Sequence, residues 1–277
     1  MKLSIITINF NNRDGLRKTI ESVVNQTWQE FEYIIIDGGS TDGSVEVIKE
    51  FADRIDYWVS EPDKGIYDAM NKGIDKATGE YCLFMNSADI IYQATTLQDV
   101  INQLDGTDII SGHLLFEHGY VMIPPQTVTA KFFFTRTLPH QATFIRRNLF
   151  EIQKYDCSYR IVSDWKFWIE MLAFENKSYK TIQSIVALFD NSGISSTNED
   201  LRIQEQQQVL KSIFQPRVLS DYHTLLRGDT YEEKLYLVIK AHKFNKAFYT
   251  LNIVIFKLFS IFSKRTAQWV KAFPFKI

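Results

Sequence analysis

Short apolar runs and amphipathic segments alternate along the first third of the chain. Four largely apolar runs have the length and the flanks of buried strands; they are 3–10, 31–37, 56–60 and 80–85. Between them, apolar residues recur at helical spacing over 16–24, 45–51 and 65–79, and the last segment ends at a glycine. Strands that alternate with helices predict a parallel sheet with right-handed crossover connections.

The loops that follow the four predicted strands are polar, and their sequences are NFNN, DGGSTDG, EPDKG and NSAD. In an open parallel sheet, ligands bind beyond the carboxyl ends of the strands, and all of these loops lie at that edge. The sequence therefore predicts one ligand site at which the four loops converge.

Beyond about residue 105 the pattern is less regular. The run 107–112 is typical of a further strand, 112–124 alternates like a hairpin, and 161–174 has the spacing of an amphipathic helix. Ser163 is the expected N-cap of this helix, and Asp164 falls in its first turn.

The chain is expected to form one main domain over 1–215, followed by a basic amphipathic helical tail over 216–277. From Lys234 onward there are nine Lys/Arg and no Asp/Glu, which leaves 22 basic and 33 acidic groups, a net charge of −11, in the first 233 residues. The apolar residues of the tail repeat at steps of four and three; they are Phe244, Phe248, Leu251, Ile255, Leu258 and Phe262.

Three lysines of the tail, Lys246, Lys257 and Lys264, fall on the opposite side of that helix. The apolar stretch is too short to span a bilayer, which needs about 20 apolar residues. A basic helix in the membrane surface, with Trp269 as an interfacial anchor, fits the pattern better. The alternative is a helix that packs on the body or on the second subunit of a homodimer.

Composition and motifs exclude several classes of protein. The chain is 45% hydrophobic over 277 residues, and its two cysteines, Cys82 and Cys157, are too far apart to suggest a zinc site or a disulfide framework. The first residues follow a strand pattern without a secretory signal, so we expect a cytoplasmic protein. Ser44 stands where a P-loop needs its lysine, and no GxGxxG follows a predicted strand. The acidic body also argues against nucleic acid as a partner.

Three acids lie in the converging loops: Asp37, Asp63 and Asp89. A carboxylate after the second strand is well placed to accept hydrogen bonds from a ribose or a base. One after the fourth strand could hold a hard divalent cation that bridges a diphosphate. Considered one at a time, each acid is better explained as a helix cap.

Read together, the surrounding phrases resemble a known family. SIITINFN, IIIDGGSTDGS, SEPDKGIYDAMNKGI, FMNSAD, LPHQATFIRR, VSDW and SGISST are similar, in this order, to motifs of family 2 glycosyltransferases, and within them to the colanic-acid-type fucosyltransferase branch. The resemblance covers about residues 3 to 200. It implies a GT-A (Rossmann-like) fold of the α/β class, with a mixed, mainly parallel sheet flanked by helices. Residues 1–112 would form the nucleotide-sugar-binding half and 113–215 the acceptor-binding half.

The resemblance also implies roles for individual residues. Phe10 and the backbone around Ile8 would flank the base, Asp37 would bind it, and Asp89 would be the metal-binding carboxylate, with Mn²⁺ or Mg²⁺ as the cation. The full set expected at the nucleotide is Ile8, Phe10, Asp37, Gly38, Asp63, Lys64, Asn71, Asn86 and Ala88. Ala88 occupies the place at which the family often has a second carboxylate, so the sequence carries a variant Asn-Xaa-small-Asp form of the metal motif.

Asp164 is the general base that the resemblance implies, because inversion at the sugar requires a group that removes the proton of the acceptor hydroxyl. Its alternative role is that of an ordinary first-turn acid. Trp165 would help to hold it in one orientation. Both Trp165 and His140 would contact the diphosphate or the acceptor, unless His140 is a packing histidine. The loop 191–197, with Gly193 and Ser195, would close over the acceptor.

These inferences predict an inverting glycosyltransferase that uses a UDP-, GDP- or dTDP-linked sugar and acts on a glycan or lipid-linked acceptor in surface polysaccharide biosynthesis. It would be a bacterial enzyme, peripheral at the inner face of the cell membrane. A sugar nucleotidyltransferase is one alternative, although NFNNRDG is a poor match to the glycine-rich basic loop it needs. A catalytically inactive scaffold subunit, in which NSAD records a lost metal site, is the other.

Overall fold

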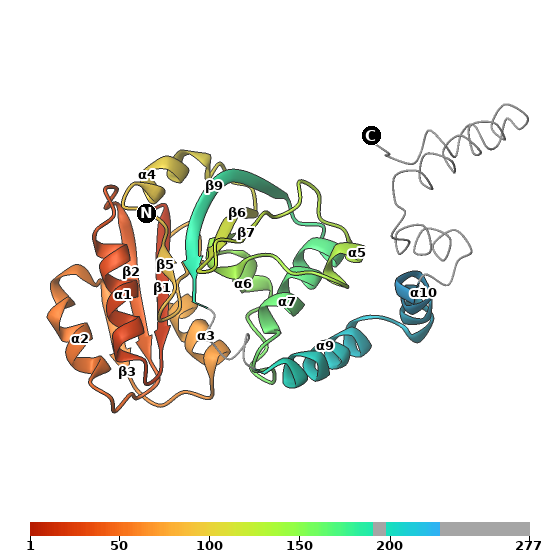
Figure 1. Ribbon diagram of the computed structural model, residues 1–277, viewed down its shortest axis with the longest axis horizontal. Coiled ribbons are helices and arrows are strands. Elements are labelled where there is room, and N and C mark those ends of the chain that lie inside the picture. Colours follow the sequence, from red (N-terminus) through yellow and green to blue (C-terminus); the bar gives the residue numbers. More distant parts are fainter. Residues whose placement is uncertain (191–197, 228–277) are drawn as a thin grey trace, which may run out of the picture. The chain divides into compact units, whose positions relative to one another are not determined.

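The computed structural model describes residues 1–190 and 198–227, and the chain divides into two compact units, Met1–Val209 and Leu210–Ile277. The amino-terminal half of the first unit alternates strands and helices (Figure 1). Its elements are β1 (Leu3–Asn9), α1 (Arg13–Val24), β2 (Phe31–Asp37), α2 (Ser44–Glu50), a 3-10 turn (Ala52–Arg54), β3 (Tyr57–Ser60), α3 (Ile66–Lys76) and β4 (Tyr81–Phe84). The predicted order of strands and helices is confirmed throughout this half.

The remaining elements are shorter and more varied. They are β5 (Ile90–Ile91), α4 (Thr96–Val100), a 3-10 turn (Ile101–Gln103), β6 (Ile109–Phe116), β7 (Val121–Met122), α5 (Ala130–Phe133), η3 (His140–Ala142), β8 (Thr143–Arg146), α6 (Leu149–Ile152), α7 (Ser163–Trp168), a π-helical turn (Ile169–Phe174), β9 (Tyr179–Phe189), α9 (Glu199–Ile213) and α10 (Pro216–Arg227). The helix α10 lies in the second unit, and the tail beyond residue 227 lies outside the described residues.

The strands form one mixed sheet in the order β3-β2-β1-β4-β8-β6-β9-β5, and β7 pairs with β6. Strands β1, β2, β3 and β4 are mutually parallel along their pairings, as predicted. Strand β8 is antiparallel to both β4 and β6, so β4, β6 and β9 point the same way. The carboxyl ends of these parallel strands therefore meet at one edge of the sheet.

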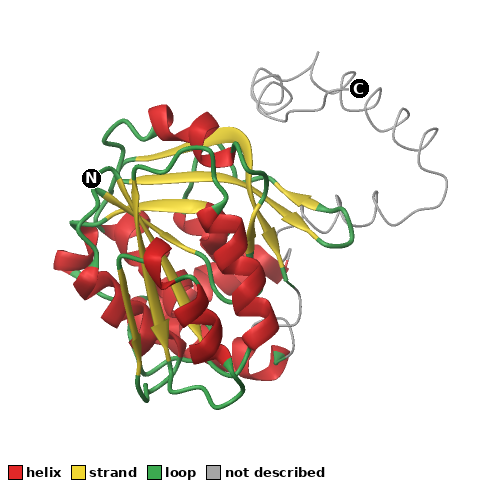
Figure 2. Cartoon of the chain, turned by 90° about the vertical axis from the view of Figure 1, so that its left-hand side faces the viewer, coloured by secondary structure: helices red, strands yellow, loops and turns green. Residues whose placement is uncertain are grey.

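Both faces of β1, β2 and β4 are largely buried, which explains why apolar residues dominate their sequences. Alternate residues such as Ile5 and Tyr33 pack with α1 and α2 in one core cluster. The opposite face meets α3, where Gly73 lies so close to Ile6 that an added Cβ would come within 2.5 Å of its side chain. Helices thus cover the sheet on both sides (Figure 2).

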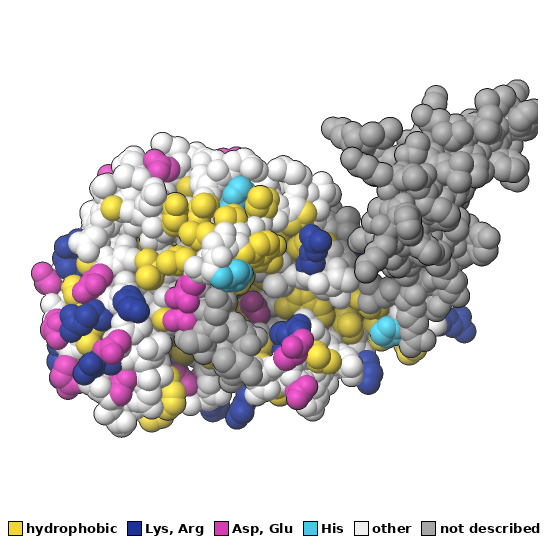
Figure 3. Space-filling model, viewed as in Figure 1, with side chains coloured by type: hydrophobic (Ala, Val, Ile, Leu, Met, Phe, Trp, Pro, Cys, Tyr) yellow, Lys and Arg dark blue, Asp and Glu magenta, His cyan; other side chains and the backbone are white. Residues whose placement is uncertain are grey.

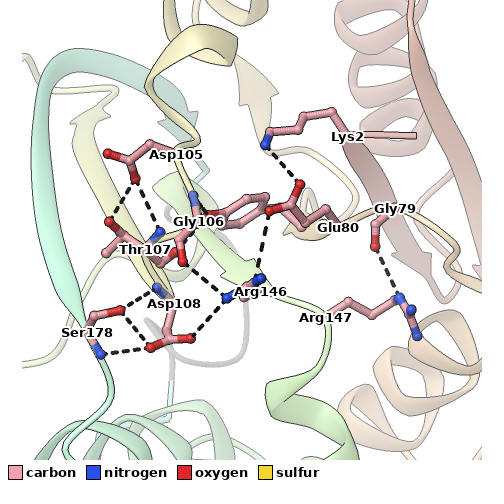
Figure 4. Close-up of polar contacts among 11 residues, drawn as sticks. Lys2, Gly79, Glu80, Asp105, Gly106, Thr107, Asp108, Arg146, Arg147 and Ser178 are labelled. Atoms are coloured by element: carbon pink, nitrogen blue, oxygen red, sulfur yellow. Dashed lines mark hydrogen bonds and ion pairs between the residues drawn. The ribbon is translucent and has the colours of Figure 1, made fainter.

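A polar network closes the opposite edge of the sheet, where β4 and β6 begin (Figure 4). Arg146 of β8 lies 4.0 Å from Glu80 and 3.9 Å from Asp108. Asp108 in turn accepts hydrogen bonds from the backbone and the hydroxyl of Ser178, at 2.9 and 2.6 Å. These partly exposed pairs join chain segments that are far apart in sequence, and each contributes little stability by itself.

The helix predicted over 161–174 is interrupted and begins differently from the prediction. It starts at Ser163 as α7 and continues from Ile169 as a π-helical turn. The predicted N-cap role of Ser163 is wrong, since the residue before the helix is Val162 and no side chain caps it. The Ser163 hydroxyl instead accepts a hydrogen bond from the backbone amide of Asp156 at 2.6 Å.

Candidate functional site

Asp37 and Asn9 are paired at the ends of β2 and β1 and join the polar loops there. The two oxygens of Asp37 accept hydrogen bonds from Asn9 Nδ2 at 2.7 Å, Ser40 Oγ at 2.6 Å, Ser40 N at 2.9 Å and Ser60 Oγ at 2.6 Å. The Asn9 amide oxygen accepts from Ser87 Oγ at 2.7 Å. The loops after β1, β2, β3 and β4 are therefore tied together, as the sequence predicted they would be.

Asp37 is fully buried, with an exposed fraction of 0%. Burial alone would raise its pKa, but the hydrogen bonds from Ser40, Ser60 and Asn9 outweigh that effect and hold the pKa below its usual value. Asp37 was expected to bind the base directly. In this structure its oxygens are already used by four protein donors, so its visible role is to fix the loops.

Phe10, Gly38 and Asp63, all expected at the nucleotide, lie side by side. The Phe10 ring is 65% exposed. A Cβ added to Gly38 would come 2.5 Å from an Asp63 carboxyl oxygen and 3.2 Å from the Phe10 ring. Because Gly38 has no side chain, the Phe10 ring and the Asp63 carboxylate can both lie against the loop that carries Gly38. The three residues come from three different loops. Lys64 follows Asp63 as an exposed residue.

Two other residues of the expected nucleotide set have structural partners. Ile8 is buried, and its carbonyl accepts hydrogen bonds from the backbone and the hydroxyl of Ser87, each at 3.1 Å. Asn71 donates to the Tyr155 carbonyl at 2.8 Å and accepts from the Tyr155 amide at 3.1 Å. The Asn71 side chain therefore fixes the backbone of the segment that carries Tyr155.

The NSAD loop is held by Thr19 of α1, a residue that the sequence did not single out. The buried Thr19 hydroxyl accepts from the Ala88 amide at 3.0 Å and lies 2.8 Å from the Asp89 carbonyl, to which it donates. Ala88 has a φ of 83°, in the left-handed region that non-glycine residues seldom occupy. The loop thus turns sharply at Ala88 around one threonine hydroxyl.

Thr19→Val is expected to destabilise the folded protein by about 1–3 kcal/mol, because the partly buried Ala88 amide would lose its acceptor. Unfolding in urea, followed by circular dichroism, measures this loss as a lower midpoint. Thr78→Val is the matched control, since Thr78 is exposed and its hydroxyl donates to Glu32 at 3.0 Å. Equal midpoints for the two variants would show that Thr19 does not hold the loop.

Asp89 is a buried carboxylate, 3% exposed, at the centre of the site. Burial raises its pKa to about 8, although hydrogen bonds from the Asp190 amide and the Gln141 side chain act in the opposite direction. Asn86, three residues earlier, has a buried side-chain oxygen without a hydrogen-bond partner among the described residues. A desolvated carboxylate and an unsatisfied amide oxygen therefore lie in the same short loop.

These two oxygens suit a hard divalent cation, which takes carboxylate and amide oxygens together with water and phosphate oxygens. Among the described residues, no cluster of three or more His, Cys, Asp or Glu side chains could hold a metal by itself. Asp89 and Asn86 would thus supply part of a coordination shell, and a bound diphosphate and water would have to complete it.

Asp164 lies in the first turn of α7, half-buried beside α3. The hydroxyl of Tyr67 lies 2.8 Å from Asp164 Oδ1 and 2.7 Å from the Ile161 carbonyl. Tyr67 is fully buried, and burial together with the negative charge of Asp164 raises its pKa well above its usual value. It therefore stays protonated and acts as a hydrogen-bond donor to these oxygens.

His140 is a buried side chain, 7% exposed. Its Nε2 lies 2.9 Å from the Tyr155 hydroxyl, and its ring stacks on Phe84 with centroids 4.9 Å apart. Burial lowers its pKa, against the opposing effect of the Asp164 charge, so the ring is neutral near pH 7. The next residue, Gln141, donates to Asp89, so the short helix η3 reaches both carboxylates.

Trp165 is a buried side chain with two backbone partners. Its indole nitrogen donates to the carbonyls of Phe133 and Arg136, at 2.9 and 3.2 Å. It therefore anchors the α5 segment to α7. Gly193 and Ser195 lie outside the described residues.

A band of hydrophobic side chains crosses one face of the molecule over β7 and β9, with acidic side chains at its lower border (Figure 3). The hairpin formed by β6 and β7 contributes Tyr120, which is 59% exposed, and Ile123, just beyond it, is 62% exposed. Phe189 packs against Phe116 of this hairpin. The backbone amide of the next residue, Asp190, donates a hydrogen bond to Asp89. The hydrophobic band thus approaches the site from the side of β9.

Comparisons with known proteins agree with this geometry. Residues 4–151 match the model of glycosyl transferase family 2. A PGL/p-HBAD biosynthesis glycosyltransferase of Mycobacterium bovis is 33% identical over 207 residues, which cover 71% of this chain and 80% of that protein.

Two solved structures share the fold, with TM-scores of 0.62. The S. aureus TarS fragment 1–349 in complex with UDP-GlcNAc is 16% identical, and the match covers 96% of this chain and 83% of that one. A mannosyltransferase of Pyrobaculum calidifontis in complex with GDP-Man and Mn²⁺ is 15% identical, with 98% and 83% covered. Both are glycosyltransferases of the GT-A fold, which confirms the predicted fold class.

The family model spans more than half of the chain, and the mycobacterial relative covers more than two thirds of it. This match sets aside the sugar nucleotidyltransferase alternative. The chain belongs to glycosyl transferase family 2 and is a glycosyltransferase.

Proposed function

We propose that this glycosyltransferase moves a sugar, with inversion, from a nucleotide-diphosphate donor to a hydroxyl of a glycan or lipid-linked oligosaccharide during synthesis of a cell-surface polysaccharide. The observation that carries the proposal is the convergence of three groups at one sheet edge: the Phe10 ring with Asp63, the Asp89 and Asn86 oxygens, and Asp164. The names of the relatives support it, since the mycobacterial protein is named for PGL/p-HBAD biosynthesis and the solved neighbours hold UDP-GlcNAc and GDP-Man.

The nucleotide would lie along the loops after β1, β2 and β3. The exposed Phe10 ring offers a face on which a base can stack, and Asp63 beside Gly38 offers a carboxylate to sugar or base donors. Asp89 and Asn86 would hold a divalent cation, which when bound neutralises the negative charge of the departing diphosphate. Lys64 would add a positive charge at the rim of the same cleft.

Asp164 would remove the proton from the acceptor hydroxyl while that oxygen bonds to the anomeric carbon. The bond from the anomeric carbon to the diphosphate oxygen breaks in the same step, and the nucleoside diphosphate leaves with its electron pair. The Tyr67 hydroxyl holds one oxygen of Asp164, which leaves the other to face the acceptor. His140, neutral and buried, supports Tyr155 in the aromatic cluster below.

The hydrophobic band over β7 and β9 supports an acceptor that has an apolar part, such as a lipid-linked glycan. Within the described parts of the chain, none of the helices combines the length and the apolar character needed to cross a bilayer. The proposed basic helix over 216–277, peripheral attachment at the inner face of the membrane, and a homodimer all depend largely on residues that lie outside the described ones. The fucosyltransferase branch suggests GDP-fucose as one donor to include.

Nucleotide release from a panel of UDP-, GDP- and dTDP-sugars, with Mn²⁺, Mg²⁺ or a chelator, tests this function. We expect one donor to be turned over in the presence of a divalent cation, and faster when a lipid-linked glycan acceptor is added. Binding of the donors is measured in parallel by calorimetry, because many transferases wait for the acceptor. A purified protein that neither binds nor turns over any donor would rule the proposal out.

A further inference from the structure

Glu205 of α9 is a buried carboxylate that reaches the loop in front of α7. It is 5% exposed, and its two oxygens accept hydrogen bonds from the backbone amides of Arg160 at 2.7 Å and Ile161 at 2.9 Å. A buried charge is tolerated when it is hydrogen-bonded in this way, and charge-assisted bonds are stronger than neutral ones. Two bonds to consecutive amides fix the orientation of this piece of backbone.

Only the Tyr67 hydroxyl lies between this piece of backbone and Asp164, the proposed base. The carbonyl of Ile161 lies 2.7 Å from the Tyr67 hydroxyl, and the same hydroxyl lies 2.8 Å from Asp164 Oδ1. A phenol has one hydrogen to donate, so the carbonyl and the carboxylate compete for it. The position of the Ile161 carbonyl therefore decides how Tyr67 holds Asp164.

We propose that Glu205 is a positioning residue for the sugar transfer step. It holds the backbone amides of Arg160 and Ile161, and with them the adjoining Ile161 carbonyl. That carbonyl sets the Tyr67 hydroxyl, which in turn orients the Asp164 carboxylate toward the acceptor. This inference rests on the proposed role of Asp164. It assigns α9, which lies outside the nucleotide-binding half, a direct effect on the rate of transfer.

Glu205→Gln breaks the clamp with little change in side-chain size, because an amide presents only one acceptor and its NH₂ group would face a backbone amide. We expect kcat to fall about 10- to 100-fold through misplacement of the base, with the donor KM unchanged. Tyr67→Phe, which removes only the hydroxyl, should lower kcat similarly. The double variant should be no slower than the slower single variant, since both changes interrupt one connection.

Glu32→Gln is the matched control. Glu32 accepts hydrogen bonds from the Thr78 amide at 2.8 Å and the Ser4 hydroxyl at 2.6 Å, at the opposite edge of the sheet. It should lower the unfolding midpoint without changing kcat. All rates are measured as nucleotide release from the donor identified in the panel, at equal concentrations of folded protein.

Several outcomes would overturn the role of Glu205. If Glu205→Gln and Glu32→Gln have the same kcat, Glu205 is only structural. If the fold-losses of Glu205→Gln and Tyr67→Phe multiply in the double variant, the two residues act independently. If Glu205→Gln does not fold, an unchanged kcat in Tyr67→Phe is sufficient to reject the connection. Silence of the wild type with every donor would instead count against the proposed function itself.

Discussion

Asp164→Asn is expected to slow sugar transfer by about 10²- to 10⁴-fold, the usual contribution of a positioned general base. Asparagine keeps an oxygen that can accept from Tyr67, which lies 2.8 Å from Asp164 Oδ1, so the local structure should persist. Asparagine cannot take a proton from the acceptor hydroxyl. The rate is measured as acceptor-dependent nucleotide release under saturating donor, and donor affinity, measured by calorimetry, should be unchanged.

Asp156→Asn is the matched control for this variant. Asp156 lies just before α7, where it pairs with Lys166 at 2.6 Å, and its carboxylate has no described contact with Tyr67. It should cost stability and leave the rate within a few-fold of the wild type. If Asp164→Asn transfers sugar as fast as Asp156→Asn, the base lies elsewhere. A catalytically inactive scaffold would show no transfer in either variant and therefore no difference between them.

Asp89→Asn should abolish the response to divalent cations and reduce transfer at least about 10²-fold. The reason is that a bound cation stabilises the negative charge of the departing diphosphate by several kcal/mol in the transition state. The same loss is expected when wild-type protein is treated with a chelator. In thermal unfolding, Mn²⁺ with nucleoside diphosphate should raise the midpoint of the wild type and leave that of the variant unchanged.

The variant should also be no less stable than the wild type when metal is removed. Asp89 is 3% exposed and burial raises its pKa to about 8, so folding without metal costs free energy to protonate or to bury this carboxylate. A neutral amide in its place avoids that cost. Asp105→Asn, at the edge shown in Figure 4, is the control, since it removes a carboxylate that pairs with Lys180 far from the site. A Mn²⁺-induced stabilisation that survives in Asp89→Asn would place the cation elsewhere.

The amino-terminal half of the fold could be predicted because most of its strands are buried on both faces. Strand β1 is uncharged and rich in isoleucine, and the helices between the strands have one apolar side each, so both patterns are visible in the sequence. Strand β8 was missed because its four residues, Thr143–Arg146, follow a loop and pair with β4 and β6 from distant parts of the chain. The local sequence carries no sign of such pairing.

The same reason separates what could be predicted about the contacts at the site from what could not. The convergence of the loops follows from strand direction alone, and it was predicted correctly. The partners of Asn71, His140 and Trp165 come from segments 84, 15 and 29–32 residues away, and these partners turn the side chains into packing contacts. Thr19 was overlooked because its bond to the Asp89 carbonyl joins residues 70 positions apart.

The backbone at Ala88 has a consequence for how such a site can diverge among related enzymes. Aspartate and asparagine adopt the left-handed region, in which Ala88 lies at a φ of 83°, more readily than alanine does. A lineage can therefore gain or lose an acidic side chain at this position by a single substitution without rebuilding the turn around Thr19. The number of carboxylates in the NSAD loop can thus change, while Thr19 and the buried Asp89 keep the geometry of the loop.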